Sequence, residues 1–249
     1  MKLIKDICYG KCDFDSRKLD IYLPDAEEFP VFIYFHGGGI EAGDKAGIEI
    51  AATELANNGV CVVSANYSLY PDAVYPEFIR DAAAAVAWTK KHINEYGKCE
   101  KFYIGGSSAG GYISMMLCFD KKYLAPYKLS PMDFAGFVHD AGQPTAHFNV
   151  LRECGMDSRR VIVDDSAPLY HIGTAAEYPH MLFIVSDNDI PGRLAQTELV
   201  MATLRHFGYD ESKFEMILMN GGHCHYVRQS GVFSKIIGDF ISKTKKNNG

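Results

Sequence analysis

A glycine-rich turn in the middle of the chain constrains its fold more than any other feature. Residues 105–111 read Gly-Gly-Ser-Ser-Ala-Gly-Gly, and their central part fits the pattern G-x-S-x-G. An apolar run at 101–104 precedes this turn, and a longer apolar run at 112–119 follows it. The pattern predicts a strand, a sharp turn and a helix, with Ser108 exposed at the N-terminus of the helix. A hydroxyl there can attack a carbonyl carbon if a neighbouring base removes its proton.

A second glycine motif bears on what this turn does. A glycine-rich turn between strand and helix can also cradle a phosphate, so the first motif alone leaves two functions open. The apolar run at 31–35 ends in His36-Gly37-Gly38-Gly39. Consecutive glycines leave backbone N–H groups uncovered by side chains, as an oxyanion hole requires. A plain tight turn is the alternative, but the two motifs in this order favour a catalytic serine.

Composition and charge exclude several classes of function. The chain has 249 residues, a 47% apolar share and a net charge of −6 at pH 7, which is ordinary for a globular protein. It carries no basic stripe with interleaved aromatic residues, so we expect no nucleic-acid partner. The N-terminus lacks a signal-peptide apolar region and no apolar run is long enough to span a bilayer. We therefore expect no membrane partner and a cytoplasmic location.

The cysteine pattern disfavours a metal site and a disulfide framework. The seven cysteines are odd in number and include no C-x-x-C pair, which fits a reducing compartment better. Cys8 and Cys12 could form one pair, and this alternative stays open. Cys61 and Cys118 lie inside apolar runs and are expected to be small core residues.

Apolar β-rich runs alternate with helical patterns along the chain. This alternation predicts one α/β domain over residues 1–249, with a mostly parallel sheet covered by helices on both faces. The first strands have no helices between them, so the sheet is expected to begin with antiparallel strands. The predicted strands are 19–23, 31–35, 60–65, 101–104, 134–139, 181–185 and 214–219, and the predicted helices are 48–58, 78–95, 110–119, 194–207 and 232–243.

One segment interrupts the alternation. Residues 140–165 form a long connection with a short helical piece near 150–154, which is typical of a lid or binding loop rather than a strand connection. An ordinary surface excursion is the alternative. The polar residues Gln143, Thr145 and His147 in this segment favour a hydroxylated or sugar-linked alcohol as part of the substrate.

A serine nucleophile needs a base and an orienting carboxylate, which in this strand–turn–helix type follow the serine in the order acid, then histidine. The strand at 181–185 ends in Ser186-Asp187-Asn188-Asp189, so both aspartates are candidates for the acid. Asp189 lies deeper in the loop and is favoured, whereas Asp187 is expected to accept local backbone N–H groups, as turn aspartates do.

The histidine candidates follow the last predicted strand. After 214–219 the chain reads Asn220-Gly221-Gly222-His223-Cys224-His225, and the glycines allow the loop to turn back toward Ser108. His223 and His225 compete for the role of the base. An H-x-H pair can also bind metal, but no third ligand at suitable spacing stands out, so we expect no metal.

These motifs resemble those of the esterase/lipase group of the α/β-hydrolase superfamily, particularly its small hormone-sensitive-lipase-like and feruloyl-esterase-like carboxylesterases. The resemblance extends from about Leu19 to Lys243. The matching residues are His36-Gly37-Gly38-Gly39 with Gly43-Asp44-Lys45, Asn66-Tyr67-Ser68-Leu69-Tyr70-Pro71 with Pro76 and Asp81, Gly106 to Gly111, Ser186 to Asp189, and Gly221-Gly222-His223. One departure is Ser68, which stands where the family usually has arginine.

The resemblance implies an α/β-hydrolase fold with a short lid and a role for each site residue. It implies that Ser108 is the nucleophile, His223 the base and Asp189 the acid. The oxyanion would be held by N–H groups of Gly38, Gly39 and Ala109, with His36 bracing the glycine loop.

The implied function is hydrolysis of small carboxylic esters, with short-chain, carbohydrate-linked and hydroxycinnamoyl esters all open. No cofactor is implied, and the oligomeric state is unknown. Two alternatives remain: an amidase of the kynurenine-formamidase type, and a non-catalytic binding protein on the same fold.

Overall fold

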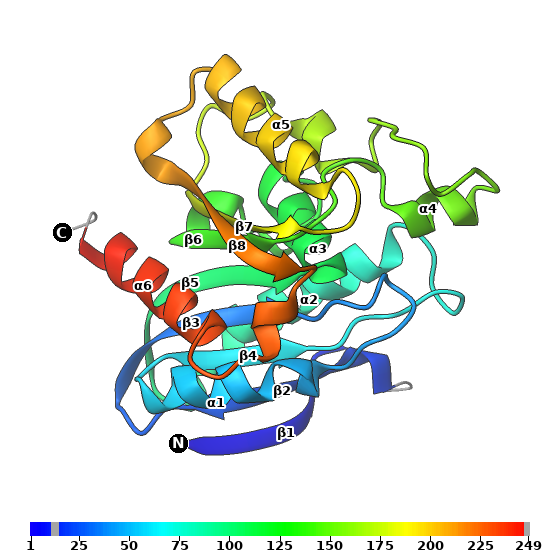
Figure 1. The fold of residues 1–249 in the computed structure, drawn as a ribbon. Coiled ribbons are helices and arrows are strands. Elements are labelled where there is room, and N and C mark those ends of the chain that lie inside the picture. Colours follow the sequence, from blue (N-terminus) through cyan, green and yellow to red (C-terminus); the bar gives the residue numbers. More distant parts are fainter. Residues whose placement is uncertain (11–14, 247–249) are drawn as a thin grey trace.

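The computed structural model describes residues 1–10 and 15–246. Its strands are β1 (Lys2–Cys8), β2 (Lys18–Leu23), β3 (Glu28–Phe35), β4 (Cys61–Ala65), β5 (Lys98–Ser107), β6 (Gly136–Asp140), β7 (His180–Asn188) and β8 (Phe214–Gly222). They form one twisted sheet in the order β1-β2-β4-β3-β5-β6-β7-β8 (Figure 1). All neighbours from β4 to β8 in this order pair in parallel, and β2 runs antiparallel to both β1 and β4.

Helices cover both faces of the sheet. They are α1 (Glu49–Asn57), α2 (Glu77–His92), α3 (Ala109–Phe119), α4 (Phe148–Glu153), α5 (Arg193–His206) and α6 (Phe233–Lys246). The apolar sides of α2, α3 and α5 belong to one buried cluster, and those of α1 and α6 belong to a second. Because each cluster contains alternate residues of the same strands, the two cores lie on opposite faces of the sheet. The predicted mostly parallel sheet with helices on both faces is confirmed.

The antiparallel start of the sheet is also confirmed, but the sequence analysis missed its first strand. β1 pairs with β2, and its sequence, Lys-Leu-Ile-Lys-Asp-Ile-Cys, alternates only in part and keeps charged residues on the exposed side. An edge strand needs few apolar residues because one side faces water, and charges there prevent pairing with other chains. The other seven strands and the helices lie where the sequence predicts them, with their ends shifted by a few residues.

The cysteines differ from the expectation at one position. Cys8 is disulfide-bonded, although the sequence disfavoured disulfides, and the possible partner Cys12 lies outside the described residues. Cys61 and Cys118 are free and buried, as predicted. Within the described ranges, no helix is both long and apolar enough to cross a bilayer. The cytoplasmic location stays a prediction.

Candidate active site

The turn at Ser108 is held in a strained shape between β5 and α3. Ser108 has φ of 56° and ψ of −112°, a backbone conformation that residues other than glycine rarely adopt. Its N–H donates to the carbonyl oxygen of Asp140 at 2.7 Å. A Cβ atom at Gly110 would lie 1.9 Å from the carbonyl oxygen of Phe35. The G-x-S-x-G spacing therefore reflects close contact between α3 and β3, which leaves the serine hydroxyl at the end of the sheet.

A continuous chain of hydrogen bonds joins three residues that lie far apart in the sequence. Nε2 of His223 lies 2.8 Å from Oγ of Ser108, and Nδ1 of His223 lies 2.6 Å from Oδ1 of Asp189. The Asp189 side chain is 1% exposed and the His223 side chain 23% exposed. These residues follow β5, β7 and β8, whose carboxyl ends meet at one edge of the sheet, where functional loops of parallel sheets gather.

His223 and two backbone amides hold the Asp189 carboxylate in its ionised form. Its oxygens accept from the N–H groups of Ile190 at 2.7 Å and Ser186 at 3.3 Å. Burial would raise the pKa of Asp189, but the hydrogen bond and charge of His223 and these two amides outweigh it, so the pKa lies below its usual value. The loop thus presents a fixed negative charge to the imidazole.

The other candidates for the acid and the base, Asp187 and His225, do not join this chain of hydrogen bonds. Asp187 is exposed, and its Oδ1 accepts the N–H of Gly221 at 2.9 Å, so this carboxylate joins the two loops rather than reaching the imidazole. His225 begins a short 3-10 helix, His225–Arg228, and its side chain is exposed. It lines the outer part of the cleft described below.

The glycine loop supplies unpaired backbone donors near Ser108. Gly38 and Gly39 have φ of 120° and 66°, and a Cβ atom at Gly38 would lie 2.0 Å from the carbonyl oxygen of Ala42. In the described part of the chain, the N–H groups of Gly38, Gly39 and Ala109 have no hydrogen-bond acceptor. Gly38 and Gly39 line the same cleft as Ser108, and amides without an acceptor are the donors that a developing oxyanion requires.

A buried imidazole fixes the shape of this loop. Nδ1 of His36 donates to the carbonyl oxygen of Gly37 at 2.7 Å, and the His36 ring stacks on Tyr67 with 4.4 Å between centroids. The Tyr67 hydroxyl donates to the His36 carbonyl at 2.8 Å. Burial lowers the pKa of His36 and keeps the ring neutral. His36 therefore braces the glycine loop and does not act as a charge.

A cleft of about 1340 Å³ surrounds Ser108 and His223. Its inner wall contains the glycine loop with the apolar residues Phe148 and Val227, and the exposed Ile190 also lines the cleft. Its outer rim is polar and exposed, and consists of Glu41, Asp44, His225, Arg228 and Gln229. An apolar interior with a polar rim is typical of a small-molecule site.

The segment after β6 carries α4 and projects at the side of the molecule (Figure 1). Phe148, the first residue of α4, lies over the glycine loop, since a Cβ atom at Gly39 would be 2.9 Å from its Cζ. Arg152 pairs with Glu41 of the glycine loop, and Glu153 accepts the N–H of Tyr75 at 2.9 Å. The segment is therefore tied to the rim of the cleft.

The polar residues expected to meet the substrate from this segment do not do so. Gln143, Thr145 and His147 are 7%, 1% and 2% exposed, and none of them lines the cleft. The Gln143 amide donates to Thr145 and to the carbonyl oxygen of Ala146. Burial lowers the pKa of His147 to about 3. These side chains satisfy the backbone of the segment from within, so the earlier interpretation is wrong.

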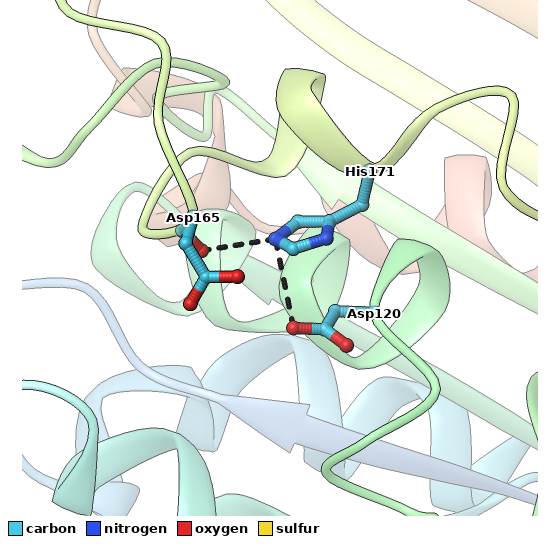
Figure 2. A group of neighbouring side chains, drawn as sticks. All are labelled: Asp120, Asp165 and His171. Carbon is cyan, nitrogen blue, oxygen red and sulfur yellow. Dashed lines mark hydrogen bonds and ion pairs between the residues drawn. The ribbon is translucent and has the colours of Figure 1, made fainter.

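One cluster of side chains has the composition of a metal site. Figure 2 shows Asp120, which follows α3, beside Asp165 and His171, whose ligand atoms all lie within 4.8 Å of one another. Nε2 of His171 donates to the carbonyl oxygen of Asp165 at 2.9 Å. The ammonium of Lys122 lies 2.8 Å from a carboxylate oxygen of each aspartate. Lys122 already supplies the positive charge between the carboxylates, so we interpret the cluster as an ionic tie between α3 and the segment above it.

Three residues near the candidate site were missed by the sequence analysis. Asp140 ends β6 beside Ser107, and the Tyr226 hydroxyl donates to its carboxylate. Arg193, at the start of α5, is 5% exposed and donates to the carbonyl oxygen of Ala141 at 3.1 Å. An acidic residue directly after a predicted parallel strand was a usable signal for Asp140. No pattern marked Tyr226 or Arg193.

Comparison with known proteins places these motifs in context. The BD-FAE family model matches residues 19–142. Esterase LipI of Mycobacterium tuberculosis is 38% identical over 96 residues, which cover 38% of this chain and 30% of LipI. Kynurenine formamidase of Danio rerio is 29% identical over 116 residues, or 46% of this chain and 38% of that protein. The chain thus spans less than half the length of these curated relatives.

A solved structure resembles the whole described fold. Esterase B from Lactobacillus rhamnosis matches with a TM-score of 0.78 and 16% identity, over 99% of this chain and 87% of that chain. At this identity the likeness concerns the fold, and it confirms the fold that the motifs predicted.

Proposed function

Because this chain belongs to the esterase/lipase group of the α/β-hydrolase superfamily, we propose that it is a serine carboxylesterase. Ser108 is the nucleophile, His223 the base and Asp189 the acid, and the N–H groups of Gly38, Gly39 and Ala109 hold the oxyanion. The observation that carries this proposal is the hydrogen-bond chain from Asp189 through His223 to Oγ of Ser108.

The geometry supports a two-step reaction. Oγ of Ser108 attacks the ester carbonyl while Nε2 of His223, 2.8 Å away, takes its proton. The same nitrogen then protonates the leaving alkoxide, and Asp189 holds the tautomer with hydrogen on Nδ1 and stabilises the imidazolium. The tetrahedral oxygen accepts from the free amides, each worth about 3 kcal/mol of barrier. Water releases the acid from the acyl-enzyme through the same groups.

The cleft supports a small acyl group and a hydroxylated alcohol. Phe148 lies over Gly39 and limits the space next to the proposed oxyanion donors, so we propose that acyl groups from acetyl to butyryl are preferred. The exposed polar rim can hydrogen-bond the hydroxyls of a carbohydrate-linked alcohol. We also propose that residues 140–165 act as a short lid, since Arg152 ties them to Glu41 at the rim.

Labelling by a fluorophosphonate probe, with nitrophenyl butyrate turnover measured beside it, tests the proposal. Ser108→Ala is expected to abolish both labelling and turnover while circular dichroism stays as in wild type. The control Ser242→Ala changes an exposed serine on α6 and should leave both unchanged. Wild-type turnover by folded Ser108→Ala would contradict the assignment of the nucleophile.

The matching kynurenine formamidase favours a second candidate function. Hydrolysis of an N-formyl amide needs the same nucleophile, base and oxyanion donors, and differs in protonating an amine rather than an alkoxide. Comparing kcat/KM for N-formylkynurenine with kcat/KM for nitrophenyl acetate distinguishes the two. A higher value for the amide would assign the chain to this second function.

A further inference from the structure

A second buried carboxylate lies behind the proposed nucleophile and base, and the mechanism above does not use it. Asp140 is 0% exposed and pairs in register with Ser107 of β5 and Ile184 of β7. Its Oδ1 accepts the hydroxyl of Tyr226. Its Oδ2 is buried and has no well-aligned hydrogen-bond partner among residues 1–10 and 15–246. A buried carboxylate with one oxygen poorly satisfied is costly in free energy.

The contacts of Asp140 lead to both reacting side chains. Its carbonyl oxygen accepts the N–H of Ser108 at 2.7 Å. Tyr226, which is 2% exposed, follows His223 by three residues and anchors that end of the loop to Asp140. The Tyr34 hydroxyl donates to Oγ of Ser107 at 3.0 Å and closes the network on the β3 side.

Burial moves the ionisation of this carboxylate toward neutral pH. Burial raises the pKa of Asp140 to about 6, against the opposing effects of the Ser107 and Tyr226 hydroxyls and of the charge on His223. The carboxylate is therefore charged above about pH 6 and neutral below it. The titratable or charged groups that face it are Tyr34 on β3, Asp189 after β7, His223, Cys224 and Tyr226 after β8, and Arg193 on α5, which binds the adjoining Ala141 carbonyl.

We propose that Asp140 is a positioning residue, whose ionised carboxylate fixes the His223–Tyr226 loop through the Tyr226 hydroxyl and favours the imidazolium of His223 during turnover. This inference rests on the proposed esterase function. Asp140 does not touch the reacting atoms and acts through His223. Its contribution is present when the carboxylate is charged and is lost as pH falls through its pKa.

Two variants and a matched control test the proposal. Asp140→Asn removes the charge and keeps the shape, and Tyr226→Phe removes the hydroxyl and keeps the ring. The control Tyr103→Phe removes another buried tyrosine hydroxyl, which binds Thr244 at 2.9 Å far from the site. Nitrophenyl butyrate hydrolysis is followed from pH 5 to 8, with fluorophosphonate labelling and thermal unfolding measured on each protein.

At pH 8 we expect kcat of Asp140→Asn to be lower than wild type by about tenfold or more, with KM little changed, since hydrogen bonds to charged groups are worth about that factor. The ratio of the wild-type kcat to the kcat of Asp140→Asn should approach one toward pH 5, where wild-type Asp140 is neutral. Tyr226→Phe should shift the acid limb to higher pH, because losing a donor raises the pKa of Asp140 further. Tyr103→Phe should change neither kcat at pH 8 nor the position of the acid limb.

The outcomes separate this inference from the proposed function. If wild type is labelled at Ser108 but both variants stay within twofold of it at every pH, the role of Asp140 is overturned. If the ratio of wild-type kcat to Asp140→Asn kcat is constant from pH 5 to 8, the role of the charge is overturned. A merely structural defect would lower kcat by the same factor at every pH, whereas loss of the charge would matter only where wild-type Asp140 is ionised. If Asp140→Asn does not fold, the shift of the acid limb in Tyr226→Phe decides. A wild type that is neither labelled nor active would overturn the proposed esterase itself.

Discussion

Asp189→Asn is the substitution that most directly tests how the base is oriented. In wild type, Oδ1 of Asp189 accepts from Nδ1 of His223 and from the N–H of Ile190, and Oδ2 accepts from the N–H of Ser186. Asparagine can place only one oxygen there. With its oxygen toward His223, the amide NH₂ faces the N–H of Ser186 and two donors meet. With the amide reversed, NH₂ faces His223 and forces the tautomer that carries hydrogen on Nε2, which cannot accept a proton from Ser108.

The expected loss follows from these two states. Replacing a charge-assisted hydrogen bond at a site that is 1% exposed removes about 1.5–3 kcal/mol. In the enzyme molecules with the reversed amide, His223 carries hydrogen on Nε2 and cannot act as the base. Together these effects predict a fall in kcat on the order of 10³- to 10⁴-fold, which corresponds to about 4–5.5 kcal/mol of barrier.

Steady-state hydrolysis of nitrophenyl butyrate at pH 8 measures this loss. The control is Asp187→Asn on the same loop, because Asp187 accepts the N–H of Gly221 and an asparagine oxygen can do the same. We expect kcat of the control to stay within a few-fold of wild type. If folded Asp189→Asn retained more than about a tenth of wild-type kcat, or if the control lost more than Asp189→Asn, the assignment of the acid would be refuted.

Two further outcomes are expected. His223→Ala should remove nearly all turnover while His225→Ala, at an exposed position, keeps most of it, as kcat values of the two purified variants will show; the reverse ranking would place the base at His225. In a series of nitrophenyl esters from acetate to palmitate, kcat/KM should peak at butyrate or shorter, and Phe148→Ala should move the peak to longer chains, because each methylene that gains apolar contact contributes about 0.8 kcal/mol. A wild-type peak at ten carbons or more would refute the short acyl pocket.

The fold was predictable because its central strands are buried on both faces. β3, β4 and β7 read as continuous apolar runs bounded by polar turns, a pattern that belongs to parallel sheets covered by helices. β1 was not predictable in this way, because it lies at an edge and three of its seven residues are exposed. The information that places an edge strand is its pairing with β2, which a local pattern does not contain.

The geometry around Ser108 was predictable for a different reason. The motifs at Ser108 and Gly38 require backbone shapes that few residues permit, so they are visible in the sequence. The polar residues of the segment after β6 carry no such signature. Gln143 and His147 satisfy buried backbone groups, and a polar residue that does so looks, in the sequence, like one that faces a substrate.

The buried charges near Ser108 lead to a final point about how the proposed site favours its reaction. Asp189 is held ionised, Asp140 is ionised above about pH 6, and burial lowers the pKa of Arg193 only to about 10, so its guanidinium stays charged at neutral pH. With His223 neutral, two carboxylates against one guanidinium leave one negative charge uncompensated in a poorly solvated region. Proton transfer from Ser108 to His223 leaves the net charge of the site unchanged: it places a positive charge near these carboxylates, and the negative charge formed with it goes to the ester carbonyl oxygen. The carboxylates therefore favour the proposed imidazolium before it forms, and the free amides receive the oxyanion, which is electrostatic preorganisation built from residues on separate segments.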